Sequence, residues 1–128
     1  MKVLLAFILC LFATAAAFAQ HGGKAEPMRI EFAAGKSSKT LTETLSNGQE
    51  MEYVFAARKG QTVTIRNSRT SLFDFRVFNQ EFDFETEFES SPKLTFEAPE
   101  TGDYLFFVRK KQVRSPRTAR FSLTLAIK

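Results

Sequence analysis

The sequence contains one stretch of nearly strict two-residue alternation, Ala119-Arg120-Phe121-Ser122-Leu123-Thr124-Leu125-Ala126-Ile127 (residues 119–127). Apolar residues occupy the odd positions, and mostly polar residues occupy the even ones. Successive side chains point to opposite faces of a β-strand, so this pattern predicts a strand with one face in a core and the other in solvent. Such a strand needs a sheet around it, which the rest of the chain must supply.

The same period recurs throughout the preceding sequence, and turn residues separate its segments. It is found at residues 28–32, 41–45, 51–57, 63–65, 73–77, 82–88, 94–98 and 104–108. Asn47-Gly48 is the strongest signal for a β-hairpin, and Lys59-Gly60 predicts a further turn. No stretch has a sustained helical period. We therefore predict one all-β domain from residue 28 to 128, an antiparallel β-sandwich or jelly roll of eight or nine strands.

The N-terminal region has the features of an export signal. Lys2 gives the N-terminus a positively charged side chain, residues 3–12 are almost entirely apolar, and Ala17-Phe18-Ala19 fits a signal-peptidase cleavage site. A membrane anchor is the alternative, but the apolar run is only about 15 residues long and no basic cluster follows it. We expect residues 1–19 to be a cleaved signal peptide and residues 20–27 to form a flexible leader. The mature chain would be periplasmic or secreted, without membrane insertion.

Cleavage limits the chemistry that remains. It leaves 109 of the 128 residues, lowers the formal net charge from +4 to +3, and removes the only cysteine, Cys10. Disulfides, thiolate metal sites and cysteine nucleophiles are then excluded. The only histidine, His21, lies in the leader without the partners that a nucleophilic triad requires. The aromatic residues have core spacing, which argues against a nucleic-acid module. We expect a protein that is not an enzyme and needs no cofactor.

One segment does concentrate carboxylates. Residues 82–88 alternate phenylalanine with acidic residues, so Asp83, Glu85 and Glu87 would share one strand face. Three such carboxylates could hold calcium, or two could act as the acid and nucleophile of a glycosidase. A charged strand face that prevents edge pairing is the simpler interpretation. The carboxylates remain a weak candidate for a metal site.

Charge is strongly sorted along the second half of the chain. Residues 81–103 hold eight acids and one base, whereas residues 105–128 hold seven bases and no acid. Pairing between an acidic and a basic strand could account for Arg109 and Arg120. It accounts less well for the bases that crowd one predicted loop, Lys110, Lys111, Arg114 and Arg117. Loops on a rigid sandwich often bind partners, so this loop could bind a protein or a polyanionic envelope polymer such as lipopolysaccharide, or it could simply be solvated.

Two segments near the ends of the mature chain carry a family resemblance. The first runs from RIEFAAGKSS (29–38) through Glu52-Tyr53-Val54 to ARKGQTVT (57–64), and the second runs from PETGDY (99–104) through the basic loop to ARFSLT (119–124). Together they resemble small exported bacterial proteins of the periplasmic g-type lysozyme inhibitor kind. They are also similar to the wider set of pre-peptidase C-terminal-like β-sandwich domains. The middle of the chain, LFDFRVFN at 72–79, departs from the inhibitor pattern.

The resemblance implies a non-catalytic protein that occludes the active-site cleft of a muramidase, with a g-type lysozyme as the candidate partner. An arginine of such an inhibitor can pair with the acidic catalytic residue of the cleft. Tyr53 matches the tyrosine of the family's Tyr-Val pair. The expected partner-binding residues are therefore Arg109, Arg114, Arg117, Tyr53, Lys110 and Lys111. The alternative is an envelope or adhesion module that binds polysaccharide or a protein surface.

Overall fold

The computed structural model describes residues 26–128, so the predicted signal segment and leader residues 20–25 lie outside the described residues. Within 26–128 the chain forms nine strands and no helix, and hence no helix that could cross a membrane. The strands are β1 (Met28–Arg29), β2 (Ser38–Ser46), β3 (Glu50–Ala57), β4 (Thr62–Asn67), β5 (Phe73–Asn79), β6 (Phe84–Glu85), β7 (Lys93–Glu97), β8 (Gly102–Lys110) and β9 (Thr118–Ile127).

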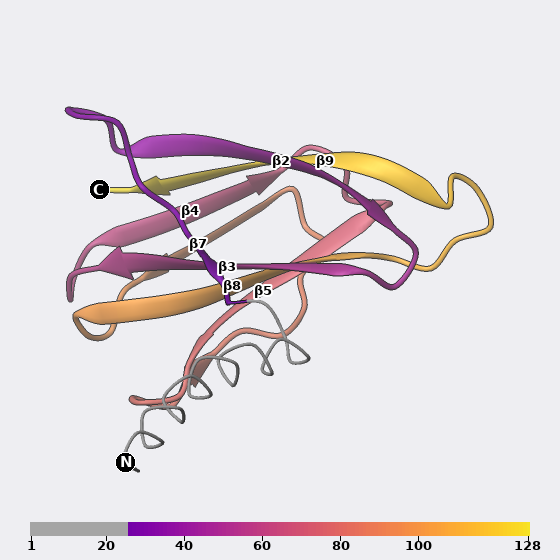
Figure 1. Cartoon of the computed structure of the whole chain (residues 1–128). Helices are drawn as coiled ribbons and strands as arrows, with labels where there is room; N and C mark the ends of the chain where they lie inside the picture. Colours follow the sequence, from indigo (N-terminus) through magenta and orange to yellow (C-terminus); the bar gives the residue numbers. More distant parts are fainter. Residues whose placement is uncertain (1–25) are drawn as a thin grey trace, which may run out of the picture.

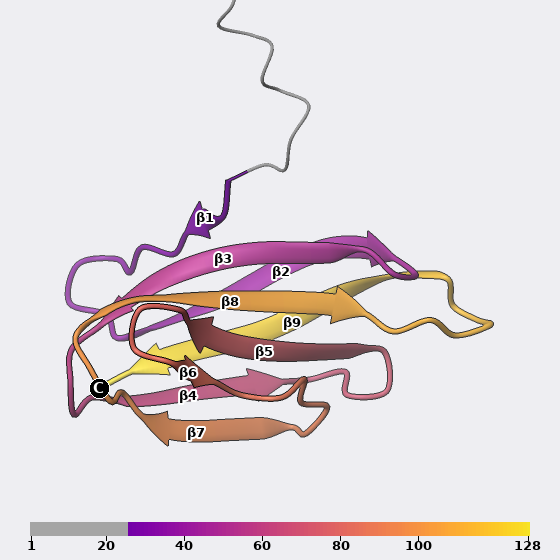
Figure 2. The same cartoon turned by 90° about the horizontal axis from the view of Figure 1, so that it is seen from below.

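The strands form two sheets that face each other (Figures 1 and 2). One sheet has the order β1-β3-β8-β5-β6 and the other has the order β2-β9-β4-β7. Strands β2 to β9 pair in nested fashion, β2 with β9, β3 with β8, β4 with β7 and β5 with β6, which is the order of a jelly roll. Every pair is antiparallel except the two-residue pairing of β1 with β3. The predicted sandwich of eight or nine strands is confirmed.

The core between the sheets is built largely from phenylalanine. Phe106 lies at its centre, with ring centroids 5.9 Å from Tyr53, 6.5 Å from Phe55 and 6.0 Å from Phe75. The alternating stretch 119–127 behaves as predicted, because its odd positions are buried against this core. Burial of apolar area is the main force that holds a domain of this kind together, and phenylalanine supplies much of that area here.

Asn47-Gly48 makes a turn but no β-hairpin, and that prediction was wrong. The turn joins β2 to β3, which lie in different sheets. Its backbone N–H groups donate to other segments, from Asn47 to the carbonyl oxygen of Arg117 (2.9 Å) just before β9 and from Gly48 to that of Lys110 (3.1 Å) at the end of β8. Gly48 has a φ of 79°, the left-handed conformation that makes Asn-Gly favourable in tight turns generally.

The predicted strand at 82–88 is also wrong, because only Phe84–Glu85 is a strand. Asp83 has a φ of 52°, which breaks the extended backbone. The rings of Phe82 and Phe84 pack 5.3 Å and 5.7 Å from Tyr104, whereas Phe88 lies on the outer face of the sheet, with the Arg109 guanidinium 3.7 Å from its ring centroid. Side-chain packing of an irregular segment thus accounts for the alternation.

Candidate functional site: a cationic loop end

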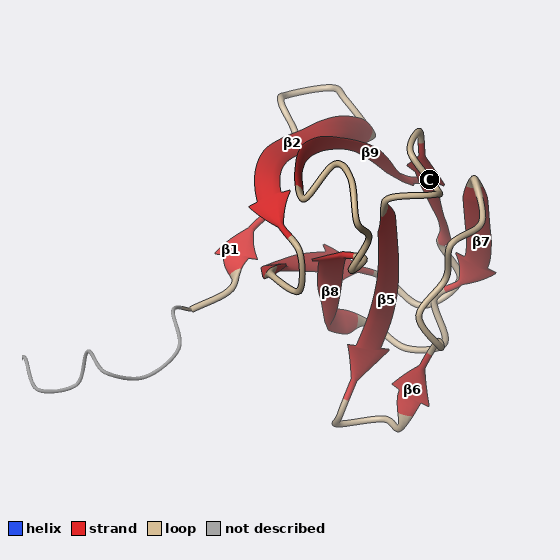
Figure 3. Ribbon diagram, turned by 90° about the vertical axis from the view of Figure 1, so that its right-hand side faces the viewer, coloured by secondary structure: helices blue, strands red, loops and turns tan. Residues whose placement is uncertain are grey.

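Hydrogen bonds join three of the four loops at one end of the sandwich, and we call these three together the cationic loop end. They are residues 47–49 between β2 and β3, residues 68–72 between β4 and β5, and residues 111–117 between β8 and β9. In Figure 1 the first and third project together at the right, and Figure 3 looks onto this end. These ranges contain Arg69, Lys111, Arg114 and Arg117 but no Asp or Glu. The fold therefore gathers positive charge from separate parts of the sequence.

Asn47 anchors the longest of these loops. Its side-chain amide Nδ2 donates to the carbonyl oxygen of Val113 (2.8 Å), and its Oδ1 accepts from the Lys110 Nζ (2.7 Å) and the Val113 N–H (3.4 Å). Together with the backbone bonds to Lys110 and Arg117, these contacts hold the 111–117 loop at its start, middle and end. A loop held at three points loses little conformational freedom when it binds a partner.

Lys110 is an internal residue, which corrects its assignment to the partner-binding set. It is fully buried at the end of β8, where its Nζ donates to Asn47 Oδ1 and to the carbonyl oxygen of Lys111 (2.9 Å). Burial, with a smaller effect of the Arg69 charge, lowers the pKa of Lys110 below its ordinary value. Its ammonium group thus supports the loop from inside and is inaccessible to a partner.

The side chains of Arg114 and Arg117 are exposed on the anchored loop, where the cis peptide bond Ser115-Pro116 lies between them. Lys111 is half-buried, and its Nζ donates to the carbonyl oxygen of Thr70 (3.0 Å), which ties the third loop to the second. Arg69 is exposed and donates from Nη1 to the carbonyl oxygen of Arg120 (3.1 Å). None of the three loops contains an acidic residue, and positive side chains gathered in this way create a local field that attracts anionic groups.

Sequence reasoning missed two residues of this end, Arg69 and Asn47. Arg69 lies more than 40 positions from the basic loop, so the distribution of charge along the sequence could not show that the two lie together. The jelly-roll order could have done so, because it places the β4–β5 loop at the same end as the β8–β9 loop.

The fourth loop at this end, residues 86–92, carries Glu87 and Glu89, but it lies beside β5, where Glu89 exchanges backbone hydrogen bonds with Phe75.

Arg109 lies on the outer face of β8 and outside the three loops. Its Nε and Nη2 donate to the two carboxylate oxygens of Asp74 at 3.1 Å and 2.9 Å, and its guanidinium stacks over Phe88. The bonded Asp74 raises the pKa of Arg109, although partial desolvation opposes this. With these donors already engaged, Arg109 organises the sheet surface and is poorly placed to contact a partner of the loop end.

Tyr53 is a core residue, which corrects its assignment to the partner-binding set. It is only 3% exposed, packs against Phe106, and lines a groove beside Met28, Lys39 and Glu43, away from the three loops. Burial, with a smaller contribution from the Glu43 charge, raises the pKa of Tyr53 to about 12. Its place in the core follows from the alternation of β3, in which Tyr53, Phe55 and Ala57 share the inward face.

We expect titration of the tyrosines to verify this burial. In a Y104F variant, phenolate absorbance should begin to rise well above the ordinary pKa of 10.0 and should have its midpoint near 12. Because the unfolded chain loses this proton at lower pH than the folded chain, stability should fall as pH rises between these two values. A reversible midpoint at the ordinary value in the folded protein would show that Tyr53 is solvent-exposed.

The three carboxylates Asp83, Glu85 and Glu87 do not form a metal site. All are exposed, and Glu85 accepts a hydrogen bond at 3.1 Å from Nη2 of Arg76. Among residues 26–128 no group of three His, Cys, Asp or Glu side chains could hold a metal ion. The physical reason is that the strand there is two residues long, so the three positions do not share a face. The proposed glycosidase pair rested on that same shared face.

Pairing between the acidic and basic segments also fails to occur. Asp103 pairs with Arg29 (2.6 Å) and Glu85 pairs with Arg76 (3.1 Å), so the acidic segment contacts arginines that precede it in the sequence. In the basic segment, Arg109 forms a salt bridge with Asp74, and Arg120 donates a hydrogen bond to the Thr42 hydroxyl (2.9 Å). Within the described residues, no salt bridge joins the acidic segment 81–103 to the loop of residues 111–117.

Known proteins share the fold of this chain, although comparison by sequence finds none of them. No protein-family model matches the sequence, and a search of curated proteins found no match either. Among solved structures, Aeromonas hydrophila PliG, a periplasmic lysozyme inhibitor of g-type lysozyme, is similar with a TM-score of 0.66 and 22% identity over 80% of this chain and 96% of its own. The chain shares the fold of the PliG inhibitors.

Two further solved structures have a similar fold. Salmonella Typhimurium PliG, also a periplasmic inhibitor of g-type lysozyme, has a TM-score of 0.65 and 22% identity over 82% of this chain and all of its own. The pre-peptidase C-terminal domain of collagenase from Bacillus anthracis has a TM-score of 0.53 and 16% identity over 83% of this chain and 98% of its own. At these identities the similarity shows the fold alone.

Proposed function

We propose that this protein is an exported, non-catalytic inhibitor that inserts its cationic loop end into the substrate cleft of a g-type lysozyme. The observation that carries the proposal is the exposure of Arg114 and Arg117 on a loop anchored by Asn47 and free of carboxylates. The fold shared with PliG proteins, which inhibit g-type lysozyme, supports the choice of partner.

The proposed mechanism is occlusion, and it requires no bond-making step. Enzymes that cleave glycosidic bonds generally use carboxyl groups in their clefts. An arginine guanidinium can donate two parallel hydrogen bonds to one carboxylate, a geometry that a hydrated lysine ammonium does not reproduce. Arg114 and Arg117 would therefore pair with acidic groups of the cleft, while Arg69 and Lys111 strengthen the attractive field around them. The field would raise the association rate, and the pairing would slow dissociation.

The test is a direct inhibition assay. The mature chain, residues 20–128, would be mixed at increasing molar ratios with lysozymes of the g, c and i types, and the rate of cell-wall lysis would be recorded. We expect inhibition of the g-type enzyme to reach completion near equimolar protein. Absence of inhibition of the g-type enzyme would refute the proposal, and absence of inhibition of every type would leave the envelope-binding alternative.

A further inference from the structure

The second sheet presents an outer face that the proposed inhibition does not use, which we call the hydroxyl face. It is formed by the outward residues of β2, β9, β4 and β7. Serine and threonine dominate it, at positions 38, 40, 42, 44 and 46 of β2, 118, 122 and 124 of β9, 62 and 64 of β4, and 95 of β7. None of the outward residues of these four strands is aromatic. The opposite sheet differs, since Leu105, Phe107 and Phe78 lie on its outer face.

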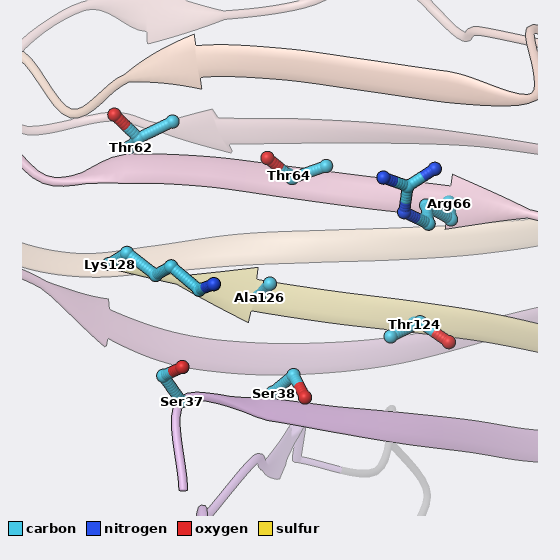
Figure 4. A pocket seen from close by; sticks show the side chains of 8 residues that line it. All are labelled: Ser37, Ser38, Thr62, Thr64, Arg66, Thr124, Ala126 and Lys128. Atoms are coloured by element: carbon cyan, nitrogen blue, oxygen red, sulfur yellow. The ribbon is translucent and has the colours of Figure 1, made fainter.

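A trough of about 530 Å³ runs across this face (Figure 4). Its floor is Ala126 of β9, which lies in register between Ser38 of β2 and Thr64 of β4. The small alanine side chain between two hydroxyl-bearing neighbours makes the depression. Arg66 and Lys128 lie toward opposite ends of the trough in Figure 4. An extended molecule lying in the trough would therefore meet a cation near each end and hydroxyl groups between.

The charge on the hydroxyl face is strongly unbalanced. Arg66 of β4 lies directly opposite Lys93 of β7, two like charges on neighbouring strands. Like charges directly opposite each other on neighbouring strands destabilise a sheet, so this pair does not serve the stability of the fold. Arg120 adds another cation, and Glu97 is the only carboxylate among the outward residues of these four strands.

The hydroxyl groups keep hydrogen-bonding capacity for a ligand. Thr40 and Thr124 share one hydrogen bond across the strands at 3.1 Å, and Thr64 and Thr95 share one at 3.4 Å. A hydroxyl has one donor and two acceptor positions, so each such pair leaves one O–H and several lone pairs unused. Outward-facing side chains repeat about every 6.7 Å along a strand and about every 4.8 Å between neighbouring strands, and the hydroxyl groups share this spacing. The result is a flat array of donors and acceptors bordered by cations.

We propose that this trough binds an extended acidic polysaccharide, one whose sugar units carry carboxylate groups. The sugar hydroxyls would pair with the serine and threonine array, and the carboxylates would pair with Arg66 and Lys128 in the trough and with Lys93, which lies beside it opposite Arg66. A nucleic acid fits less well, because single-stranded bases need aromatic stacking platforms and this face has none. A protein partner fits less well because binding hot spots are usually aromatic or apolar anchors in pockets.

The test uses polygalacturonate as a carboxylated probe, dextran as a neutral polysaccharide and single-stranded DNA as a polyanion without sugar carboxylates, each measured by calorimetric titration of the mature chain. We expect polygalacturonate to bind and the other two to bind at least tenfold more weakly. An R66Q/K93Q variant should lose at least tenfold in affinity for polygalacturonate, because it removes two charge-assisted contacts. The same variant should melt no lower than the wild type, since it relieves a like-charge pair.

The matched control is R114A/R117A, which removes two positive charges from the loop end. It should bind polygalacturonate like the wild type, while R66Q/K93Q should inhibit lysozyme like the wild type. Unchanged affinity in R66Q/K93Q, loss of affinity in R114A/R117A alone, or equal binding of dextran or DNA would each overturn the proposal. Because the two variants address separate surfaces, failure here is distinguishable from failure of the proposed inhibition.

Discussion

Replacing Arg114 and Arg117 together with alanine should abolish most of the inhibition of g-type lysozyme while leaving the domain folded. Each arginine is expected to donate hydrogen bonds to an acidic group, and a hydrogen bond to a charged partner contributes about 1.5–3 kcal/mol. Loss of both then weakens binding between about a hundredfold and ten-thousandfold. Both side chains are exposed, so the free energy of unfolding should change by no more than about 0.5 kcal/mol. The measurements are the inhibition constant and a denaturant unfolding curve.

The chain offers a control with the same change in charge. Arg58 and Lys59 are exposed in the loop between β3 and β4, and the R58A/K59A variant lowers the net charge by the same two units. If inhibition depends on the loop end, this variant should inhibit like the wild type. Equal loss of inhibition in the two variants would show that overall charge carries the effect, and the assignment of Arg114 and Arg117 would be wrong.

The fold was predictable because its central strands combine period two with a rich supply of apolar residues. The stretch 119–127 alternates so regularly that only a half-buried strand satisfies it. Strand partners were not predictable in the same way. Asn47-Gly48 shows that the chain reverses, but a turn does not reveal whether the next strand joins the same sheet or the opposite one.

The errors in the candidate site have a common physical origin. Lys110 follows Tyr104, Phe106 and Val108 at the same two-residue spacing, so continuing the alternation would have placed it inward. Its charge favoured a solvent-exposed assignment, because a buried lysine is rare and requires hydrogen-bond partners. The partner is Asn47, which is 63 positions away along the chain, and no local pattern could indicate that contact. Arg114 and Arg117 needed no such partner, and the sequence alone placed them in an exposed loop.

The contact between Asn47 and Lys110 leads to the second large effect, which concerns stability and loop order together. An N47A variant should lower the free energy of unfolding by about 3 kcal/mol, because it leaves a buried ammonium group with one hydrogen bond fewer and releases Val113. Inhibition should also weaken, although every arginine is intact, because the 111–117 loop must then be ordered on binding. Denaturant unfolding and the lysis assay measure the two consequences separately.

A K110M substitution separates the buried charge from the loop anchor. K110M alone should change stability by no more than about 1 kcal/mol, since replacing a buried charge with an apolar side chain of similar size is often nearly neutral. The N47A/K110M double variant should be more stable than N47A, because the uncompensated charge is gone, yet its inhibition should stay weak, because Val113 remains unanchored. Equal stability of N47A and the double variant would show that the ammonium group does not depend on Asn47.

The pH dependence of stability gives an independent check on the same buried group. The folded-state pKa of Lys110 is lowered, so between that pKa and the ordinary value of 10.5 the unfolded chain binds more protons than the folded chain. The wild type should therefore gain stability as pH rises through this window, relative to K110M, which has no proton to lose at this position. Comparing the two proteins at each pH cancels the opposing effect of the tyrosines, which both retain. Parallel stability curves would mean that the Lys110 ammonium is as well solvated in the folded state as in the unfolded chain, and the loop anchor would then rest on Asn47 and Val113 alone.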